Sequence, residues 1–113
     1  MNECLFCRII DKKIPAVFEY ESDSLIAIRD INPQAPTHLL VIPKKHIERV
    51  SDADKNHTSL LGEMILLSKY LAKRKKLEEG FRLVFNDGAK AGQSVFHVHL
   101  HLLGGRLMHW PPG

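Results

Sequence analysis

Three histidines alternate with aliphatic residues near the end of this 113-residue chain. His97, His99 and His101 are separated by Val98 and Leu100. In an extended strand successive side chains point to opposite faces, so the three imidazoles would lie on one face about 6.6 Å apart. A half-exposed strand with histidines on its polar face by coincidence is the alternative interpretation. Since neutral imidazole acts as nucleophile, proton carrier or metal ligand near neutral pH, strict alternation favours a chemical site.

A glycine-containing loop comes directly before the histidines. Gly92 and Ser94 in this loop offer backbone N–H groups and a hydroxyl, which are groups that bind the oxygens of an anion. A simple turn would explain the loop equally well in isolation. Its position next to three in-phase histidines favours a phosphate site.

The two cysteines of the chain, Cys4 and Cys7, stand near its start. They are too few for the disulfide framework of a secreted protein, and their two-residue gap suits a metal or redox pair in a reducing compartment. Two small buried residues are the alternative interpretation. The sequence around the pair lacks a thioredoxin-like βαβ pattern, which disfavours a purely redox role.

Composition limits the class of protein. A chain of 113 residues with 44% hydrophobic residues suits one globular domain. The net charge of +3 mildly favours anionic ligands without selecting phosphate or nucleic acid. No apolar run reaches the roughly 18 residues of a membrane span, and the first residues lack the order of a signal peptide. We therefore expect a cytoplasmic protein without a membrane partner.

Hydrophobic periodicity predicts the elements that position these residues. It predicts one short N-terminal helix, one long helix over 58–77 that is capped by Gly80, and a helical region that begins at Ser51 or Asp52. Strands are predicted over residues 17–21, 24–30, 38–42 and 81–85, and from residue 97 to the break at Gly104-Gly105. This order indicates an α+β fold in which the long helix covers a mainly antiparallel sheet.

The sequence His-Val-His-Leu-His-Leu-Leu at residues 97–103 resembles the motif of the histidine triad (HIT) superfamily, His-φ-His-φ-His-φ-φ with φ apolar. Further similar segments are residues 6–10, 30–38, 42–46, 92–95 and 109–113, and the last resembles the HINT branch of nucleotide-binding proteins. The resemblance covers nearly the whole chain. It implies a single HIT domain over residues 1–113 with an HIT-like sheet.

The resemblance implies an activity, the hydrolysis of purine nucleoside 5′-phosphoramidates at the α-phosphorus, as by an adenosine 5′-monophosphoramidase. His99 would attack phosphorus, form a nucleotidyl-histidine intermediate and, after hydrolysis, release AMP or GMP. His38 would support the proton relay, and His97 would be a further member of the catalytic set. The residues expected to hold the phosphate oxygens are His101, Ser94 and Asn86.

A nucleotide site and a homodimer follow from the same resemblance. Asp30 would bind the ribose hydroxyls, aliphatic residues would surround the base, and Trp110 would reach the partner subunit's site. The implied nucleotide-binding set is Phe6, Ile9, Ile14, Asp30, Ile31, Leu40, Asn86, Gly92, Gln93, Ser94, Val95, His99, His101 and Trp110. The long helix and a neighbouring strand would form the dimer interface.

The cysteine pair resembles that of zinc-bearing HIT relatives and departs from the metal-free HINT proteins. The implied ligands of a structural zinc are Cys4, Cys7, His46 and His97, with no organic cofactor. His97 as a ligand is less available as an acid or base, so its two expected roles compete.

Two alternatives to the phosphoramidase remain. One is hydrolysis of dinucleoside polyphosphates, as in another HIT branch, which fits the C-terminal ending less well. The other is a nucleotide-binding adaptor whose hydrolysis is incidental. Neither alternative implies a nucleic acid partner.

Overall fold

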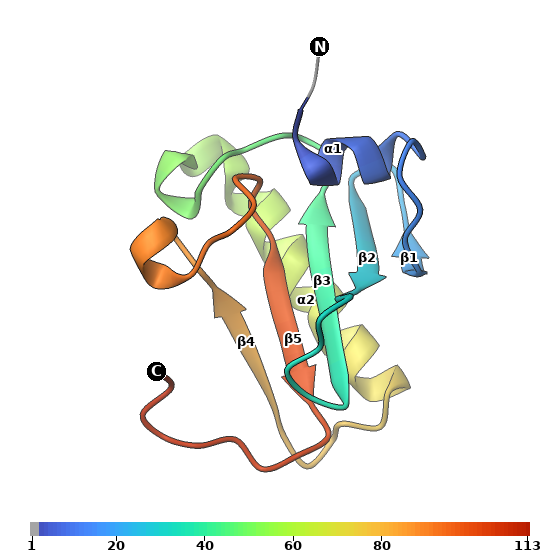
Figure 1. Ribbon diagram of the computed structural model, residues 1–113, viewed down its shortest axis with the longest axis vertical. Coiled ribbons are helices and arrows are strands. Elements are labelled where there is room, and N and C mark those ends of the chain that lie inside the picture. Colours follow the sequence, from blue (N-terminus) through green and yellow to red (C-terminus); the bar gives the residue numbers. More distant parts are fainter. Residues whose placement is uncertain (1–2) are drawn as a thin grey trace.

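Five antiparallel strands form one sheet in the order β1-β2-β3-β5-β4, and a long helix crosses one of its faces (Figure 1). The computed structural model describes residues 3–113, so Met1 and Asn2 of the predicted domain lie outside the described residues. A short helix lies across one end of the sheet. The elements are α1 (Leu5–Ile10), β1 (Phe18–Glu21), β2 (Leu25–Arg29), β3 (Thr37–Pro43), α2 (Thr58–Arg74), β4 (Phe81–Phe85) and β5 (Leu100–Gly104). The predicted α+β architecture is confirmed.

Alternation along the strands divides the interior into two clusters. In β3, Leu39 and Val41 are buried in the cluster beneath α2. Leu40 and Ile42 belong instead to a second cluster, which includes residues of α1. Because neighbouring side chains of a strand point to opposite faces, His38 shares the face of Leu40. The sheet therefore has one face for the main core and one for the predicted site.

The end of α2 differs from the predicted end. The helix stops at Arg74, and Lys76 takes a left-handed φ of 61°. The N–H of Leu77 then donates to the carbonyl of Ala72 at 2.9 Å, which is the closing bond of a Schellman motif. The predicted cap at Gly80 is wrong, because the last carbonyls are already satisfied before the chain reaches it.

The start of α2 also differs from the predicted one. Two 3-10 turns, Val50–Asp52 and Lys55–His57, precede the helix where a continuous helical region from residue 51 or 52 is predicted. Ala53 between them has extended dihedral angles, which interrupts the helical path. Within the described residues no helix is long and apolar enough to cross a membrane.

The histidine strand is shorter than predicted. The regular ladder begins at Leu100, so His101 is the one histidine of the three inside β5. Its neighbour β3 ends at Pro43, which has no N–H to extend the ladder. The chain before Leu100 bonds elsewhere, since the N–H of Val98 donates to the carbonyl of Ile47 at 2.7 Å. Val98 is still buried beneath α2, so the alternation of faces persists beyond the strand.

Candidate active site and metal centre

A chain of hydrogen bonds fixes the protons of two imidazoles on adjacent strands. The backbone N–H of Gln34 donates to Nδ1 of His38 at 3.0 Å, so the proton of His38 lies on Nε2. That Nε2 lies 2.9 Å from Nδ1 of His101 and donates to it. The proton of His101 must therefore lie on its Nε2. Among the buried side-chain atoms of residues 3–113, this Nε2 is the one without a hydrogen-bond partner, so the site holds a donor ready for a ligand oxygen.

His99 has the opposite arrangement of donor and acceptor nitrogens. Its Nδ1 donates to the carbonyl oxygen of His97 at 2.7 Å. The proton is thereby held on Nδ1, and Nε2 keeps a lone pair. The rings of His99 and His101 lie 5.0 Å apart between centroids. Two neighbouring rings thus carry an imidazole lone pair and an imidazole N–H donor.

Burial keeps these imidazoles neutral. It is the main cause that lowers the pKa of His101 to about 4, and the neighbouring His99 and His38 act in the same direction. Burial also lowers the pKa of His99 and of His38. The charge of Asp30 opposes these shifts, and one of its oxygens lies 3.4 Å from Nε2 of His38. At neutral pH the site therefore offers neutral nucleophile and donor groups.

The four predicted metal ligands converge on one point. Cys4 and Cys7 come from the start of α1, His46 from the loop after β3, and His97 from the segment before β5. Their ligand atoms all lie within 4.8 Å of one another. The Nε2–H of His97 donates to the carbonyl of Pro43 at 2.7 Å, which turns Nδ1 toward the cluster.

The spacings within this cluster fit tetrahedral zinc. With Zn–N of about 2.0–2.1 Å and Zn–S of about 2.3 Å, tetrahedral edges measure about 3.3 Å between nitrogens and about 3.6 Å between sulfur and nitrogen. Nδ1 of His46 and Nδ1 of His97 are 3.1 Å apart, and Sγ of Cys4 and of Cys7 lie 3.4 and 3.5 Å from Nδ1 of His97. Burial lowers the pKa of His97 to about 4, so the ring is in the neutral form that binds a metal.

A second group, Asp30, His38 and His101, is also close enough to hold a metal. There, however, the facing nitrogens of the two histidines are joined by a hydrogen bond. Oδ1 of Asp30 accepts the N–H of Asn32 at 2.8 Å. Hydrogen bonds therefore already engage the atoms of this group that could bind a metal.

Most of the residues expected around the base are brought together. Phe6, Ile9, Ile14, Leu40 and Val95 share the second apolar cluster. The ring of Phe6 meets that of His99 edge-on, with 4.9 Å between the centroids. These side chains form an apolar wall beside the candidate nucleophile.

Two other residues of the expected nucleotide set are not in this cluster. Ile31 is 97% exposed on the loop before β3, and Trp110 is 82% exposed near the C-terminus. Neither side chain is buried in the cluster, so neither prediction gains support within the single chain.

The loop from residue 86 to residue 95, here called the phosphate loop, follows β4. Gly92 takes a left-handed φ of 98°, and a Cβ added there would come within 3.8 Å of the amide nitrogen of Asn86. The two residues are therefore adjacent, as the expected phosphate set requires. Ser94 is exposed, whereas the side chain of Gln93 is buried and turned away from solvent.

Sequence reasoning missed the backbone groups that orient the histidines. The N–H of Gln34 and the carbonyls of Pro43 and His97 set which nitrogen of each imidazole carries the proton. No sequence signal identifies such groups, because almost every residue has the same N–H and carbonyl.

Fold and site together define a histidine-triad type of protein, in which three alternating histidines and a fourth from a neighbouring strand share one sheet face. The HIT domain family matches residues 11–108. The chain belongs to this family.

Known relatives are similar along nearly the whole chain. A 14 kDa zinc-binding protein of Zea mays is 49% identical over 111 residues, which are 96% of this chain and 87% of the relative. The adenylylsulfatase HINT1 of Arabidopsis thaliana is 47% identical over 96% of this chain and 76% of its own length. A HIT family hydrolase from Legionella pneumophila Philadelphia 1 has a solved structure with a TM-score of 0.97 and 52% identity, covering 98% of this chain and 100% of that chain.

The lowered pKa of the half-buried His101 predicts a stability change with pH. Below pH 6.5 the unfolded chain protonates this imidazole, whereas the folded protein resists protonation until about pH 4. The free energy of unfolding should therefore decrease as pH falls from 6.5 to 4, and less steeply in His101→Asn. Urea unfolding of both proteins over this range measures the difference. Protonation of the metal ligands affects both equally, so identical slopes would contradict the shifted pKa.

Proposed function

We propose that this protein hydrolyses the P–N bond of purine nucleoside 5′-phosphoramidates and releases AMP or GMP. The observation that carries the proposal is the fixed polarity of the site. Nε2 of His99 holds a lone pair because Nδ1 donates to the carbonyl of His97. On the neighbouring ring, the buried Nε2–H of the half-buried His101 lacks a hydrogen-bond partner.

The reaction proceeds in two displacements. Nε2 of His99 attacks the α-phosphorus, a P–N bond forms to the imidazole, and the bond to the leaving amine breaks as that nitrogen takes up a proton. Water then attacks the nucleotidyl-histidine and restores the imidazole. His101 Nε2–H, with the Ser94 hydroxyl, stabilises the charge that develops on the phosphoryl oxygens.

The nucleoside occupies the face next to α1. The apolar wall that includes Phe6 and Leu40 takes the planar purine, because apolar surroundings with few polar anchors suit a base. Asp30, half-buried at the end of β2, binds the ribose hydroxyls. The phosphate loop, which begins at Asn86, completes the site at the phosphate.

Adenylyl sulfate is a second candidate substrate. The name of the Arabidopsis relative, an adenylylsulfatase, favours it. Adenylyl sulfate also carries its leaving group on the α-phosphorus, so the same attack by His99 would serve. Sulfate leaves as a stable anion, whereas an amine must take up a proton as it leaves. Only the phosphoramidate therefore requires a general acid.

Replacing the nucleophile tests the proposal. We expect His99→Asn to lower kcat/KM for adenosine 5′-phosphoramidate by about 10³-fold or more. AMP affinity should change little, since the Asn side chain fits the same space. Turnover of the phosphoramidate, adenylyl sulfate and a diadenosine polyphosphate is measured in parallel, with His57→Asn outside the site as the matched control. Unchanged turnover in His99→Asn would exclude the nucleophile, and a wild-type preference for the polyphosphate would overturn the substrate class.

A structural zinc ion is part of the proposal. The spacings among Cys4, Cys7, His46 and His97 and the name of the Zea mays relative support it. Bound there, zinc joins α1 to the sheet and supplies no chemistry to the phosphorus. Thiols kept reduced for a metal fit the cytoplasm, where we place the protein.

Removal of the thiols tests the zinc site. The protein purified without added metal should contain about one zinc ion per chain, and Cys4→Ser/Cys7→Ser should contain almost none. Its Tm should also fall, because α1 loses its connection to the sheet. Elemental analysis and thermal unfolding measure both, with His57→Asn as a control that retains the metal. Equal zinc in the double variant would exclude these ligands.

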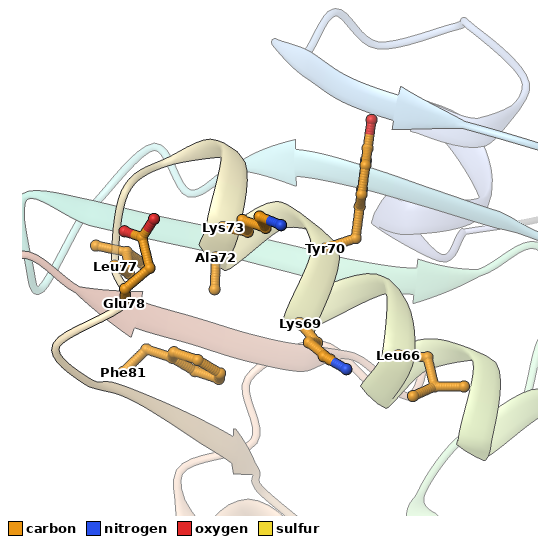
Figure 2. Close-up of a pocket in the computed structure, with 8 residues that line it drawn as sticks. All are labelled: Leu66, Lys69, Tyr70, Ala72, Lys73, Leu77, Glu78 and Phe81. Carbon is orange, nitrogen blue, oxygen red and sulfur yellow. The ribbon is translucent and has the colours of Figure 1, made fainter.

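A homodimer through α2 and β4 completes the proposed function. Leu66 and Tyr70 are 64% and 52% exposed on α2, and Phe81 begins the edge strand β4 beside them. Figure 2 shows them among the residues that line one hollow, together with Ala72, Leu77 and the charged Lys69, Lys73 and Glu78. The hollow has a volume of about 550 Å³. An apolar hollow next to an unpaired strand edge suits a second copy, because edge pairing satisfies the free backbone groups. Trp110 would then reach the site of the second copy.

A charge placed in this hollow tests the dimer. Wild-type protein should sediment as a dimer, and Leu66→Asp should shift it to monomer, since a charged side chain would have to lose its water where an apolar side chain packs. Val17→Asp, at an apolar residue that is 54% exposed and outside the hollow, is the matched control. Analytical ultracentrifugation distinguishes the outcomes. A dimer that persists in Leu66→Asp would place the interface elsewhere.

A further inference from the structure

One buried amide side chain closes the phosphate loop. Gln93 is 4% exposed. Its Oε1 accepts the N–H of Gly88 at 2.8 Å, and its Nε2 donates to the carbonyls of Glu48 at 2.8 Å and Val95 at 3.1 Å. A primary amide has two N–H donors, and both are used.

The backbone of Gln93 is engaged as well. Its N–H donates to the carbonyl of Gly88 at 3.1 Å. Every N–H group of the residue therefore bonds within the protein, and none is left for an anion. Ser94, the next residue, is exposed and has its hydroxyl available.

The partners of Gln93 connect the phosphate loop to the candidate nucleophile. The carbonyls of Ile47 and Glu48, directly after the proposed metal ligand His46, accept hydrogen bonds from both segments, and we call this pair the anchor. The carbonyl of Ile47 accepts the N–H of Val98, directly before His99, and the carbonyl of Glu48 accepts Nε2 of Gln93, directly before Ser94. The anchor thus sets the separation between the Ser94 hydroxyl and the His99 imidazole.

We propose that Gln93 is a positioning residue that holds Ser94 in register with His99 and does not itself bind the phosphate through a donor. This role rests on the proposed function, because it assumes that Ser94 contacts the phosphate. It also refines the expectation that Gln93 belongs to the nucleotide set. Gln93 would affect phosphate binding indirectly, by fixing the conformation of the phosphate loop.

Other side chains cannot replace this amide. A glutamate would place an oxygen against the carbonyls of Glu48 and Val95, where two donors are needed. A methionine of similar length would leave the N–H of Gly88 and both carbonyls unpaired in a buried place. The other end of the loop has separate support, since Asp87 accepts the N–H of Ser51 at 3.1 Å. Loss of Gln93 should therefore displace the Ser94 end of the loop and leave the fold intact.

Affinity for ligands with and without a phosphate tests the role. We expect Gln93→Met to raise the Kd of AMP about tenfold and to leave the Kd of adenosine within about twofold, because the displaced Ser94 would contact the phosphate and not the nucleoside. The kcat for adenosine 5′-phosphoramidate should fall more than KM rises. Titration calorimetry and steady-state kinetics measure these changes, and thermal unfolding establishes that the variants are folded. If Gln93→Met does not fold, Gln93→Glu, which keeps the bond from Gly88, replaces it.

A double-mutant cycle with Ser94→Ala distinguishes positioning from a general loss of structure. If Gln93 acts through Ser94, the double variant binds AMP no more weakly than the weaker single variant. Additive losses, or equal weakening of AMP and adenosine, would overturn the inference. The cycle is measured by binding, so it decides the role of Gln93 even if the wild-type protein does not cleave phosphoramidates. Absence of AMP binding by the wild-type protein would overturn both proposals.

Discussion

The orientation of one buried residue, His97, controls both halves of the site. Its Nδ1 belongs to the cysteine and histidine cluster, its Nε2 donates to the carbonyl of Pro43, and its own carbonyl accepts Nδ1–H of His99. The side chain is fully buried, so no water competes for these bonds. The residue that anchors the proposed zinc therefore also determines which nitrogen of His99 is free. If zinc binds as proposed, Nδ1 of His97 is occupied by the metal and is unavailable as an acid or base.

Burial makes this histidine-rich site chemically useful. Several imidazoles lie close together on the same sheet face. A proton on one of them would make protonation of its neighbour less favourable. With the pKa values of His97 and His101 at about 4, the rings stay neutral and exchange hydrogen bonds instead. Each ring is then a donor at one nitrogen and an acceptor at the other. A backbone N–H or carbonyl group bonded to one ring nitrogen determines which nitrogen donates and which accepts.

Segments outside the strands position Ser94 and His99. The strands present His38 and His101 on one face through simple alternation, whereas Ser94 and His99 lie outside the regular strands. The phosphate loop follows β4, and the segment after β3 holds both it and the residues before β5. The position of Ser94 relative to His99 thus depends on bonds between segments that are 45 or more residues apart.

The sequence by itself determined the elements and the faces. Alternation and short apolar runs predicted the strands, and alternation predicted the common face of the histidines. Apolar spacing predicted α1 and α2, because all these patterns are local. Only the tertiary structure decided where α2 ends, since Lys76 takes the left-handed position, and where β5 begins, since Pro43 cannot extend the ladder. It alone decided the proton positions of the imidazoles and the inward turn of Gln93, because their partners are backbone groups that the residue types do not distinguish. The expected ligand set followed from family resemblance, and folding brought Cys4 and His97 together across 93 residues.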